Sequence, residues 1–201
     1  FIGASLSAAT ASVMAGANVA EASATKPQKW DKTVNVVIIG SGGAGLATAV
    51  SAAENGVKDI LVLEKLAFLG GNTAIATGAF NTADPKQKEQ GIEDSPELHA
   101  QQTLKGGDFR ANPELVNELT HNSYDTLTWL ESKGVKFQPK ILQVYGALWP
   151  RSHATAASKG SDYIRVLSEE AKKLGVMIQT QAKVVDIIRE NQLSGRVLGV
   201  E

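Results

Sequence analysis

The sequence predicts an α/β fold built on a parallel β-sheet. Residues 34–39 form a short apolar, β-branched run, which is typical of a strand buried on both faces. An alanine-rich stretch at 44–55 has the composition of a helix and stops at Gly56, a residue type that commonly ends helices. A second apolar run at 59–63 completes a strand–helix–strand unit. In such a unit the two strands are parallel and the crossover is right-handed.

The composition excludes several classes of function for this chain of 201 residues. Lysine and arginine total 20 and aspartate and glutamate total 21, so a formal net charge of −1 offers nucleic acid no concentrated positive surface. The absence of cysteine rules out disulfides, thiolate metal sites and thiol nucleophiles. The three histidines, His99, His121 and His153, do not lie at metal-ligand spacing, so we expect no metal site.

Residues 1–24 have the composition of the apolar core of an export signal. They carry one charge, Glu21, and are too weakly apolar to form a stable membrane span. Ala-Ser-Ala at 22–24 fits the small-x-small pattern of a cleavage site. The first three residues, Phe-Ile-Gly, resemble the segment after the arginine pair of twin-arginine signals. We therefore expect an export-signal remnant at 1–24, a polar lead-in at 25–33 and a periplasmic location reached by the twin-arginine route.

Proline and small polar residues place the starts of two helices in the middle of the chain. Ser95 and Asn112 are each followed by proline and glutamate, which favour the first helical position and the positive end of the helix dipole. The second helix is expected to end near Gly134 and to bury a stripe formed by Val116, Leu119, Leu127 and Leu130. We expect irregular chain from the second strand to about residue 90, and again over 137–160.

The C-terminal part predicts a further helix, strand and hairpin. Ser161 is expected to cap a helix that presents one apolar stripe, and 176–180 predicts a third buried strand. Residues 183–189 and 196–201 predict the two strands of a hairpin. Because a hairpin is marginally stable alone, we expect further chain to cover it. We interpret 34–201 as the incomplete N-terminal part of one domain.

The pattern Gly-x-Gly-x-x-Gly directly follows the first strand and opens the first helix. Gly40 permits a tight turn, Gly42 allows the backbone to approach a pyrophosphate, and Gly45 allows the helix to pack closely on the strand. The phosphates are expected at the positive end of the helix dipole. Glu64 closes the second strand, where a carboxylate accepts hydrogen bonds from ribose hydroxyls and repels a 2′-phosphate. These residues predict a dinucleotide site in a Rossmann-like domain and leave FAD and NAD as alternatives.

A second glycine cluster favours FAD over NAD. Gly-Gly-Asn-Thr at 70–73, followed by Gly78, supplies further backbone amides and two small polar side chains. Such a row suits a ligand that extends beyond its adenosine half.

Beyond these spacings, the sequence resembles a known family, the soluble fumarate reductase flavoproteins, which include the flavocytochrome c and urocanate reductase group. The resemblance is carried by Val-Ile-Ile-Gly-Ser-Gly-Gly-Ala-Gly at 37–45, Leu-Glu-Lys at 63–65, Gly-Gly-Asn-Thr at 70–73, Lys-Gly-Gly-Asp at 105–108 and Arg-Ser-His at 151–153. It implies an FAD-binding domain interrupted by a mobile capping domain, with the substrate held between them beside the flavin. The present chain would stop before that cap.

The resemblance also implies a set of cofactor-binding residues. Ala44 and its neighbouring glycines match the pyrophosphate loop, Glu64 matches the ribose carboxylate, and three later residues match positions that line the flavin. In membrane-bound succinate dehydrogenase relatives, a histidine bonded covalently to the flavin takes the place of Asn72. Asparagine cannot form that bond, so the FAD is expected to be non-covalent. The predicted cofactor-binding residues are Gly40, Gly42, Gly43, Ala44, Gly45, Glu64, Lys65, Gly70, Gly71, Asn72, Thr73 and Gly78.

The activity that the resemblance implies is reduction of the C=C bond of a small unsaturated carboxylate by hydride transfer from reduced flavin. Electrons are expected from an external donor such as a cytochrome or flavin module. The family's catalytic residues would fall after Glu201, so no catalytic residue is assigned to this chain, and the fragment alone is expected to be inactive. The alternatives are a dehydrogenase or oxidase of the same superfamily, similar to succinate dehydrogenase or L-aspartate oxidase, and a non-catalytic dinucleotide-binding fragment.

One arginine and the three histidines are further candidates outside the predicted cofactor-binding residues. We interpret Arg151 and His153 as loop residues that hydrogen-bond locally near the cofactor rather than as substrate ligands. His99 and His121 lie on predicted helices and are expected to face solvent.

Overall fold

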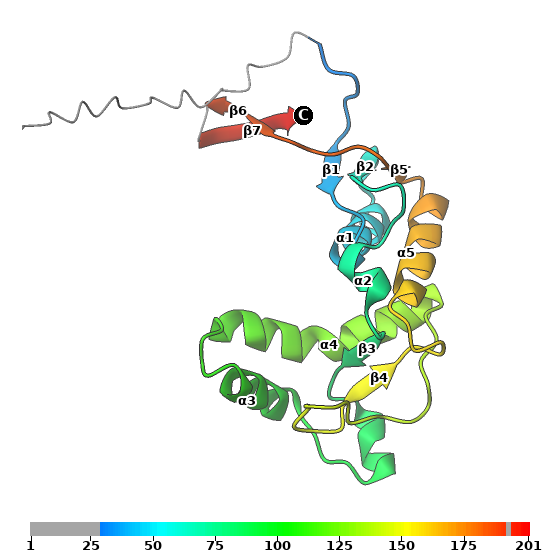
Figure 1. Ribbon diagram of the computed structural model, residues 1–201, viewed down its shortest axis with the longest axis vertical. Helices are drawn as coiled ribbons and strands as arrows, with labels where there is room; N and C mark the ends of the chain where they lie inside the picture. The colour runs from blue at the N-terminus through cyan, green and yellow to red at the C-terminus, as the bar shows by residue number, and fades with distance from the viewer. Residues whose placement is uncertain (1–28, 192–193) are drawn as a thin grey trace, which may run out of the picture.

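The computed structural model describes residues 29–191 and 194–201, and its centre is a three-stranded parallel β-sheet (Figure 1). The strand order is β1-β2-β5, and both pairings are parallel, which confirms the predicted α/β class. The predicted export signal and the first part of the lead-in lie outside the described residues. The strands are β1 (Val36–Ile39), β2 (Ile60–Leu63) and β5 (Met177–Gln179).

Two helices cover one face of this sheet. They are α1 (Gly43–Glu54) and α5 (Ser161–Lys173). Because side chains alternate along a strand, Ile38 of β1 and Val62 of β2, which pair in register, point together toward the helices. Both are buried, and they form one core with Leu46 on α1 and Leu167 on α5. This core sets where β1 ends and α1 begins, and so positions the glycine-rich turn between them.

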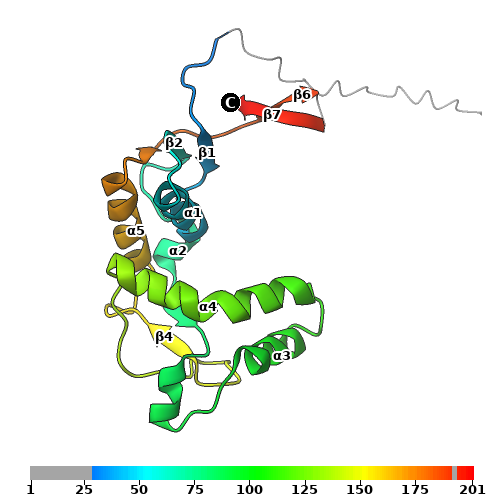
Figure 2. The ribbon, with the colours of Figure 1, turned by 180° about the vertical axis from the view of Figure 1, so that it is seen from behind.

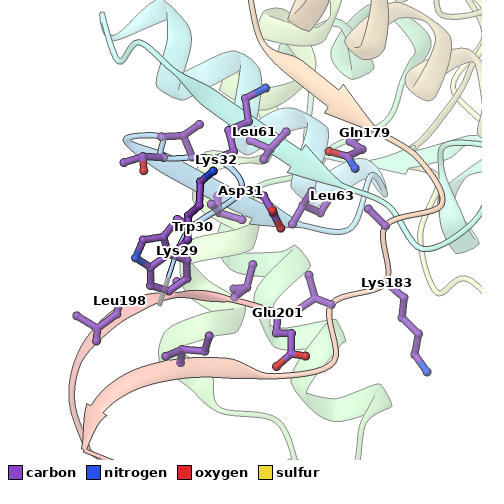
Figure 3. A pocket seen from close by; sticks show the side chains of 18 residues that line it. Lys29, Trp30, Asp31, Lys32, Leu61, Leu63, Gln179, Lys183, Leu198 and Glu201 are labelled. Carbon is purple, nitrogen blue, oxygen red and sulfur yellow. The ribbon is translucent and has the colours of Figure 1, made fainter. Parts of the chain in front are cut away.

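The opposite face of the sheet borders a hollow of about 590 Å³ (Figure 3). Val37 and Leu61, which pair across β1 and β2, line it together with Trp30 and the C-terminal hairpin. The hairpin consists of β6 (Ile187–Asn191) and β7 (Ser194–Val200). Since this cover is partial, Ile39 keeps 53% of its surface exposed. The prediction that the first strand is buried on both faces is therefore wrong, and β5 at the sheet edge is likewise only half-buried or exposed.

The predicted hairpin is confirmed, but its strands begin and end at different residues than predicted. β6 begins at Ile187 rather than at residue 183, and β7 begins at Ser194 rather than at residue 196. The pairing is irregular on both sides of Arg189, with shifts of register there. Such a bulge adds an unpaired residue to one strand and interrupts the alternation of side chains there, so a regular apolar pattern does not mark the strand ends.

Two further helices pack against each other beyond α1 and α5 (Figure 2). Their predicted caps are confirmed, because the Ser95 side chain accepts a hydrogen bond from the Leu98 amide (3.1 Å) and the Asn112 side chain accepts one from the Glu114 amide (2.8 Å). Within the described ranges, no helix is long and apolar enough to cross a membrane. The two helices that begin at the Ser95 and Asn112 caps are α3 (Pro96–Gly106) and α4 (Pro113–Lys133).

The buried face of α4 differs in one position from the predicted apolar stripe. Leu119 is 59% exposed, whereas the other three predicted residues are buried. Two polar residues, Thr120 and Ser123, take places on the buried face, and Ser123 is held there by a hydrogen bond with Thr82 (2.7 Å). Leu119 lies at the edge of this face, because each residue turns the helix by about 100°.

Both segments predicted as irregular contain short elements. β3 (Ala79–Asn81) pairs antiparallel with β4 (Ser152–Ala154) and so joins the two segments (Figure 1). The first segment also contains α2 (Gly71–Ile75) and the 3-10 helix η1 (Pro85–Gln90). Elements of three to six residues are too short to show a periodicity in the sequence, so the prediction missed them.

The start of α5 is set by packing and not by a serine cap. Gly160 occupies the N-cap position without a side-chain hydrogen bond, so the predicted capping role of Ser161 is wrong. A Cβ atom at Gly160 would collide with the carbonyl oxygen of Thr73 in α2. The Gly160 amide also donates a hydrogen bond to the Ala76 carbonyl (2.8 Å). Helix α5 therefore begins where Gly160 packs against the backbone of the α2 segment and hydrogen-bonds to it.

We predict that Leu127→Ala lowers the free energy of unfolding by about 2–5 kcal/mol, because truncation of a buried side chain leaves a cavity. Leu119→Ala on the same helix is the matched control and should change this free energy by less than about 0.5 kcal/mol. Urea denaturation followed by circular dichroism measures both variants. Equal losses of stability would contradict the assignment of Leu119 to the exposed side of α4.

Candidate cofactor site

The first glycine-rich turn brings α1 against the end of β1. Gly40 has φ = +95°, a conformation that favours glycine, and its amide donates a hydrogen bond to the Leu63 carbonyl at the end of β2 (2.8 Å). Gly45 lies in the first turn of α1, and a Cβ atom there would collide with the Gly40 carbonyl oxygen. The close packing of helix on strand that the motif predicts therefore requires glycine at this position.

The N-terminus of α1 presents open amides. None of the described side chains caps the helix at Gly42. The first helical hydrogen bond runs from the Leu46 amide to the Gly42 carbonyl (3.0 Å), so the amides of Ala44 and Gly45 precede it without a helical acceptor. Ala44 is exposed. Open amides at the positive end of a helix dipole can bind a phosphate.

Glu64 is held at the end of β2 by Ser41. Its Oε2 accepts hydrogen bonds from the Ser41 amide (3.0 Å) and hydroxyl (2.6 Å), and its Oε1 accepts one from the Leu66 amide (2.9 Å). Burial opposes ionisation of this carboxyl, but the hydrogen bonds from Ser41 and Leu66, with the nearby charge of Lys65, outweigh it and lower the pKa of Glu64. An ionised carboxylate therefore lies at the position that the sequence predicts for the ribose ligand.

The second glycine cluster packs against the first and hydrogen-bonds to it. Gly70 has φ = +115°, and a Cβ atom there would clash with side chains of α2 and α5. The Gly70 amide donates to Ser41 Oγ (3.2 Å), and the Gly43 amide donates to Thr73 Oγ1 (3.1 Å). Gly42 and Gly70 also pair as an isolated parallel bridge. Two clusters that are separated in the sequence by most of α1 and by β2 thus form one backbone cradle.

A hollow of about 320 Å³ adjoins this cradle. Thr73 belongs to both, and Gly78, with φ = +79°, is buried at the wall of the hollow. The three residues predicted to line the flavin therefore lie together, whereas the Lys65 side chain is exposed at the end of β2. The lining residues are Asn72, Thr73, Ala76, Thr77, Gly78, Ala79, Gly160 and Tyr163.

Three residues of this arrangement were not predicted from the sequence. Ser41 occupies the variable position between the first two glycines, and its bond to Glu64 connects two strand ends. Gly160 and Tyr163 reach the α2 segment from the start of α5, and Tyr163 donates a hydrogen bond to the Gly78 carbonyl (2.9 Å). A local sequence pattern does not predict a contact between segments that lie so far apart in the chain.

Arg151 and His153 hydrogen-bond within the protein, but the prediction of loop residues with local partners is wrong, because their carboxylate partners lie 57 and 69 residues away in the chain and His153 belongs to β4. The Arg151 guanidinium donates two bonds to the buried Asp94 carboxylate (2.9 and 2.8 Å), and His153 Nε2 lies 3.2 Å from the Asp84 carboxylate. His121, which was expected to face solvent, is exposed and lies 3.3 Å from a Glu97 oxygen.

His99 does not face solvent, contrary to the prediction. It is 6% exposed on α3. Burial, together with the charge of Arg151, lowers the pKa of His99 to about 4, so its imidazole is neutral at physiological pH. The position of the helix was predicted correctly, but α3 has too few apolar residues to indicate which of its faces packs against the protein.

The arrangement of these groups fits an FAD molecule. The cradle offers open amides for the pyrophosphate and an ionised carboxylate for the ribose. The adjoining hollow, lined mainly by small residues, has room for part of a ring system. Gly42 places no side chain between the N-terminus of α1 and such a ligand.

The comparison with protein families agrees with this geometry. Residues 35–201 match the family model described as an FAD binding domain. The chain belongs to this family. FAD is therefore the cofactor of this FAD-binding domain, as predicted from the second glycine cluster.

Several proteins similar to this chain are named as reductases or dehydrogenases. The acrylate reductase flavoprotein subunit of Shewanella woodyi is 34% identical over 197 residues, which are 98% of this chain and 38% of that protein. The open conformation of a flavocytochrome c3 fumarate reductase matches with a TM-score of 0.77 and 29% identity, covering 85% of this chain and 30% of that one. The 3-ketosteroid-Δ4-(5α)-dehydrogenase of Rhodococcus jostii RHA1 matches with a TM-score of 0.73 and 28% identity, covering 89% and 43%.

These matches confirm the resemblance to fumarate reductase flavoproteins. The chain spans 38% of the acrylate reductase subunit and less than half of either matched structure.

We predict that Gly45→Ala weakens FAD binding by about 5- to 150-fold, because overpacking against a backbone oxygen costs about 1–3 kcal/mol. Gly106→Ala is the matched control, since a Cβ atom at Gly106 meets nothing within 4 Å. Titration of the two apoproteins with FAD, with circular dichroism to verify folding, measures the effect. A folded Gly45→Ala variant with unchanged FAD affinity would contradict the assigned packing of α1 on β1.

Proposed function

We propose that the protein is an FAD-dependent oxidoreductase of the fumarate reductase type, which reduces the C=C bond of a small unsaturated carboxylate. The observation that carries this proposal is the joined double-glycine cradle, with its open helix amides, ionised Glu64 and adjoining hollow. The names of two similar proteins support the choice of substrate class, because acrylate and fumarate are both unsaturated carboxylates.

In this proposal the residues of the chain bind and orient the cofactor. The amides of Ala44 and Gly45 hold the pyrophosphate, and Glu64 accepts hydrogen bonds from the ribose hydroxyls. Asn72 and Thr73 lie beside the ring system, and an asparagine side chain at that place leaves the FAD non-covalent. Bound FAD supplies the hydride chemistry itself. An external donor, such as a cytochrome or flavin module, supplies the electrons.

A second candidate function is oxidation of a saturated substrate by a dehydrogenase or oxidase of the same fold. The similarity to the ketosteroid dehydrogenase structure, with a TM-score of 0.73, favours it. The two candidates differ in the direction of electron flow. The binding of FAD by the cradle is common to both.

We also propose that the protein is exported and works in the periplasm. The proposal rests on the small, weakly charged composition of residues 1–24 and on the Ala-Ser-Ala tripeptide at 22–24.

The proposed activity predicts that the full-length, FAD-loaded protein oxidises a reduced dye under anaerobic conditions when fumarate, urocanate or acrylate is added. The expected turnover is about 1–10³ per second, the usual range for enzymes. Dye absorbance measures the rate, and succinate, which has no C=C bond, is the matched control.

Protein that leaves the dye reduced with all three compounds would contradict the reductase proposal. Rapid flavin reduction by a saturated substrate, with release of peroxide in air, would favour the second candidate instead.

A further inference from the structure

The carbonyl oxygen of Gly78 accepts two hydrogen bonds at the wall of the hollow. One comes from the Tyr163 hydroxyl on α5 (2.9 Å) and the other from the Thr155 amide (3.2 Å). Tyr163 is 8% exposed, so this hydroxyl is removed from water. A buried hydroxyl needs a partner, and Tyr163 finds it in a peptide group that belongs to the flavin-lining segment.

The same peptide group carries the amide of Ala79 on its other side. In a trans peptide the carbonyl and the following N–H point in opposite directions. In an antiparallel ladder, successive residues alternate between the partner strand and the opposite edge. Because the Gly78 carbonyl and the Thr82 amide both bond toward β4, the Ala79 amide is directed to the other edge of β3. Ala79 is exposed there and lines the hollow.

We propose that Tyr163 is a positioning residue for the flavin, because its hydroxyl orients and polarises the peptide group whose Ala79 amide is offered to the bound ring system. Hydrogen bonds connected in series polarise one another. A hydrogen bond to the Gly78 carbonyl polarises its peptide group and so makes the Ala79 N–H of the same group a stronger donor. A stronger donor beside a flavin stabilises the electron-rich reduced form and raises its potential. This inference rests on FAD lying in the hollow and does not depend on which substrate is reduced.

Two further observations support Tyr163 as a hydrogen-bond donor: its hydroxyl stays protonated, and its ring is held in place by packing. Burial and, to a lesser extent, the neighbouring Asp162 raise the pKa of its phenol, so the hydroxyl stays protonated at all physiological pH values. Its ring packs against Phe137, with the ring centroids 6.1 Å apart. A phenylalanine at position 163 would keep this packing and lose only the hydroxyl, which makes Tyr163→Phe a clean test.

The test compares the flavin midpoint potential of full-length, FAD-loaded wild type, Tyr163→Phe and Tyr145→Phe by equilibration with reference dyes. Tyr145 is fully exposed and serves as the matched control. We expect the ratio of reduced to oxidised flavin at a fixed potential to fall about tenfold in Tyr163→Phe, which is about 30 mV for a two-electron couple. Tyr145→Phe should match wild type.

A second variant keeps the inference testable if Tyr163→Phe does not fold. Site-specific replacement of Tyr163 by 3-fluorotyrosine retains the hydroxyl, makes it a stronger donor, and should move the potential upward. An unchanged potential in FAD-loaded Tyr163→Phe, even with altered stability, would overturn the inference and leave Tyr163 a purely structural residue. No substrate enters these measurements, so they stand apart from any failure of the proposed reductase activity.

Discussion

One buried hydroxyl group holds the cofactor cradle together. Ser41 Oγ donates to Glu64 and accepts from the Gly70 amide, so a single atom joins the ends of β1 and β2 to the start of α2. A hydrogen bond to a charged group contributes about 1.5–3 kcal/mol, and an unpaired partner at this depth would carry a desolvation penalty. Ser41 therefore fixes the ribose carboxylate relative to the pyrophosphate amides, and the Gly43–Thr73 hydrogen bond and the Gly42–Gly70 bridge add to its link with the flavin-lining segment.

Around that hydroxyl, glycines determine how closely the segments approach. Gly45 of α1 lies against the Gly40 carbonyl, and Gly160 before α5 lies against the Thr73 carbonyl, with no room for a Cβ atom at either place. At these two places the helices approach the cradle through backbone atoms, whereas Tyr163 and Ile164 of α5 reach it with side chains. The donors that the site offers are mainly peptide groups held by packed elements, which suits a cofactor that carries its own charge and its own chemistry.

The sequence predicts the parts of this arrangement that are local. The glycine motif between two apolar runs predicts the turn, the helix and Glu64, and the serine and asparagine caps predict two helix starts. The missing parts are contacts between distant segments, such as Tyr163 with Gly78 or β3 with β4, which leave no periodicity in either segment. The burial of His99 was missed for a related reason, because its environment is formed by residues far along the chain, Arg151 among them.

The most direct test of the central role of Ser41 is a double-mutant cycle on FAD affinity, with Ser41→Ala, Glu64→Gln and the double variant. Apoproteins are titrated with FAD at pH 7, and Ser51→Ala, at an exposed position of α1, is the control. We predict that each single variant binds FAD roughly tenfold more weakly and that the double variant loses clearly less than the product of the two, because both remove one shared interaction. Independent, multiplicative losses, or full affinity in Ser41→Ala, would contradict the account.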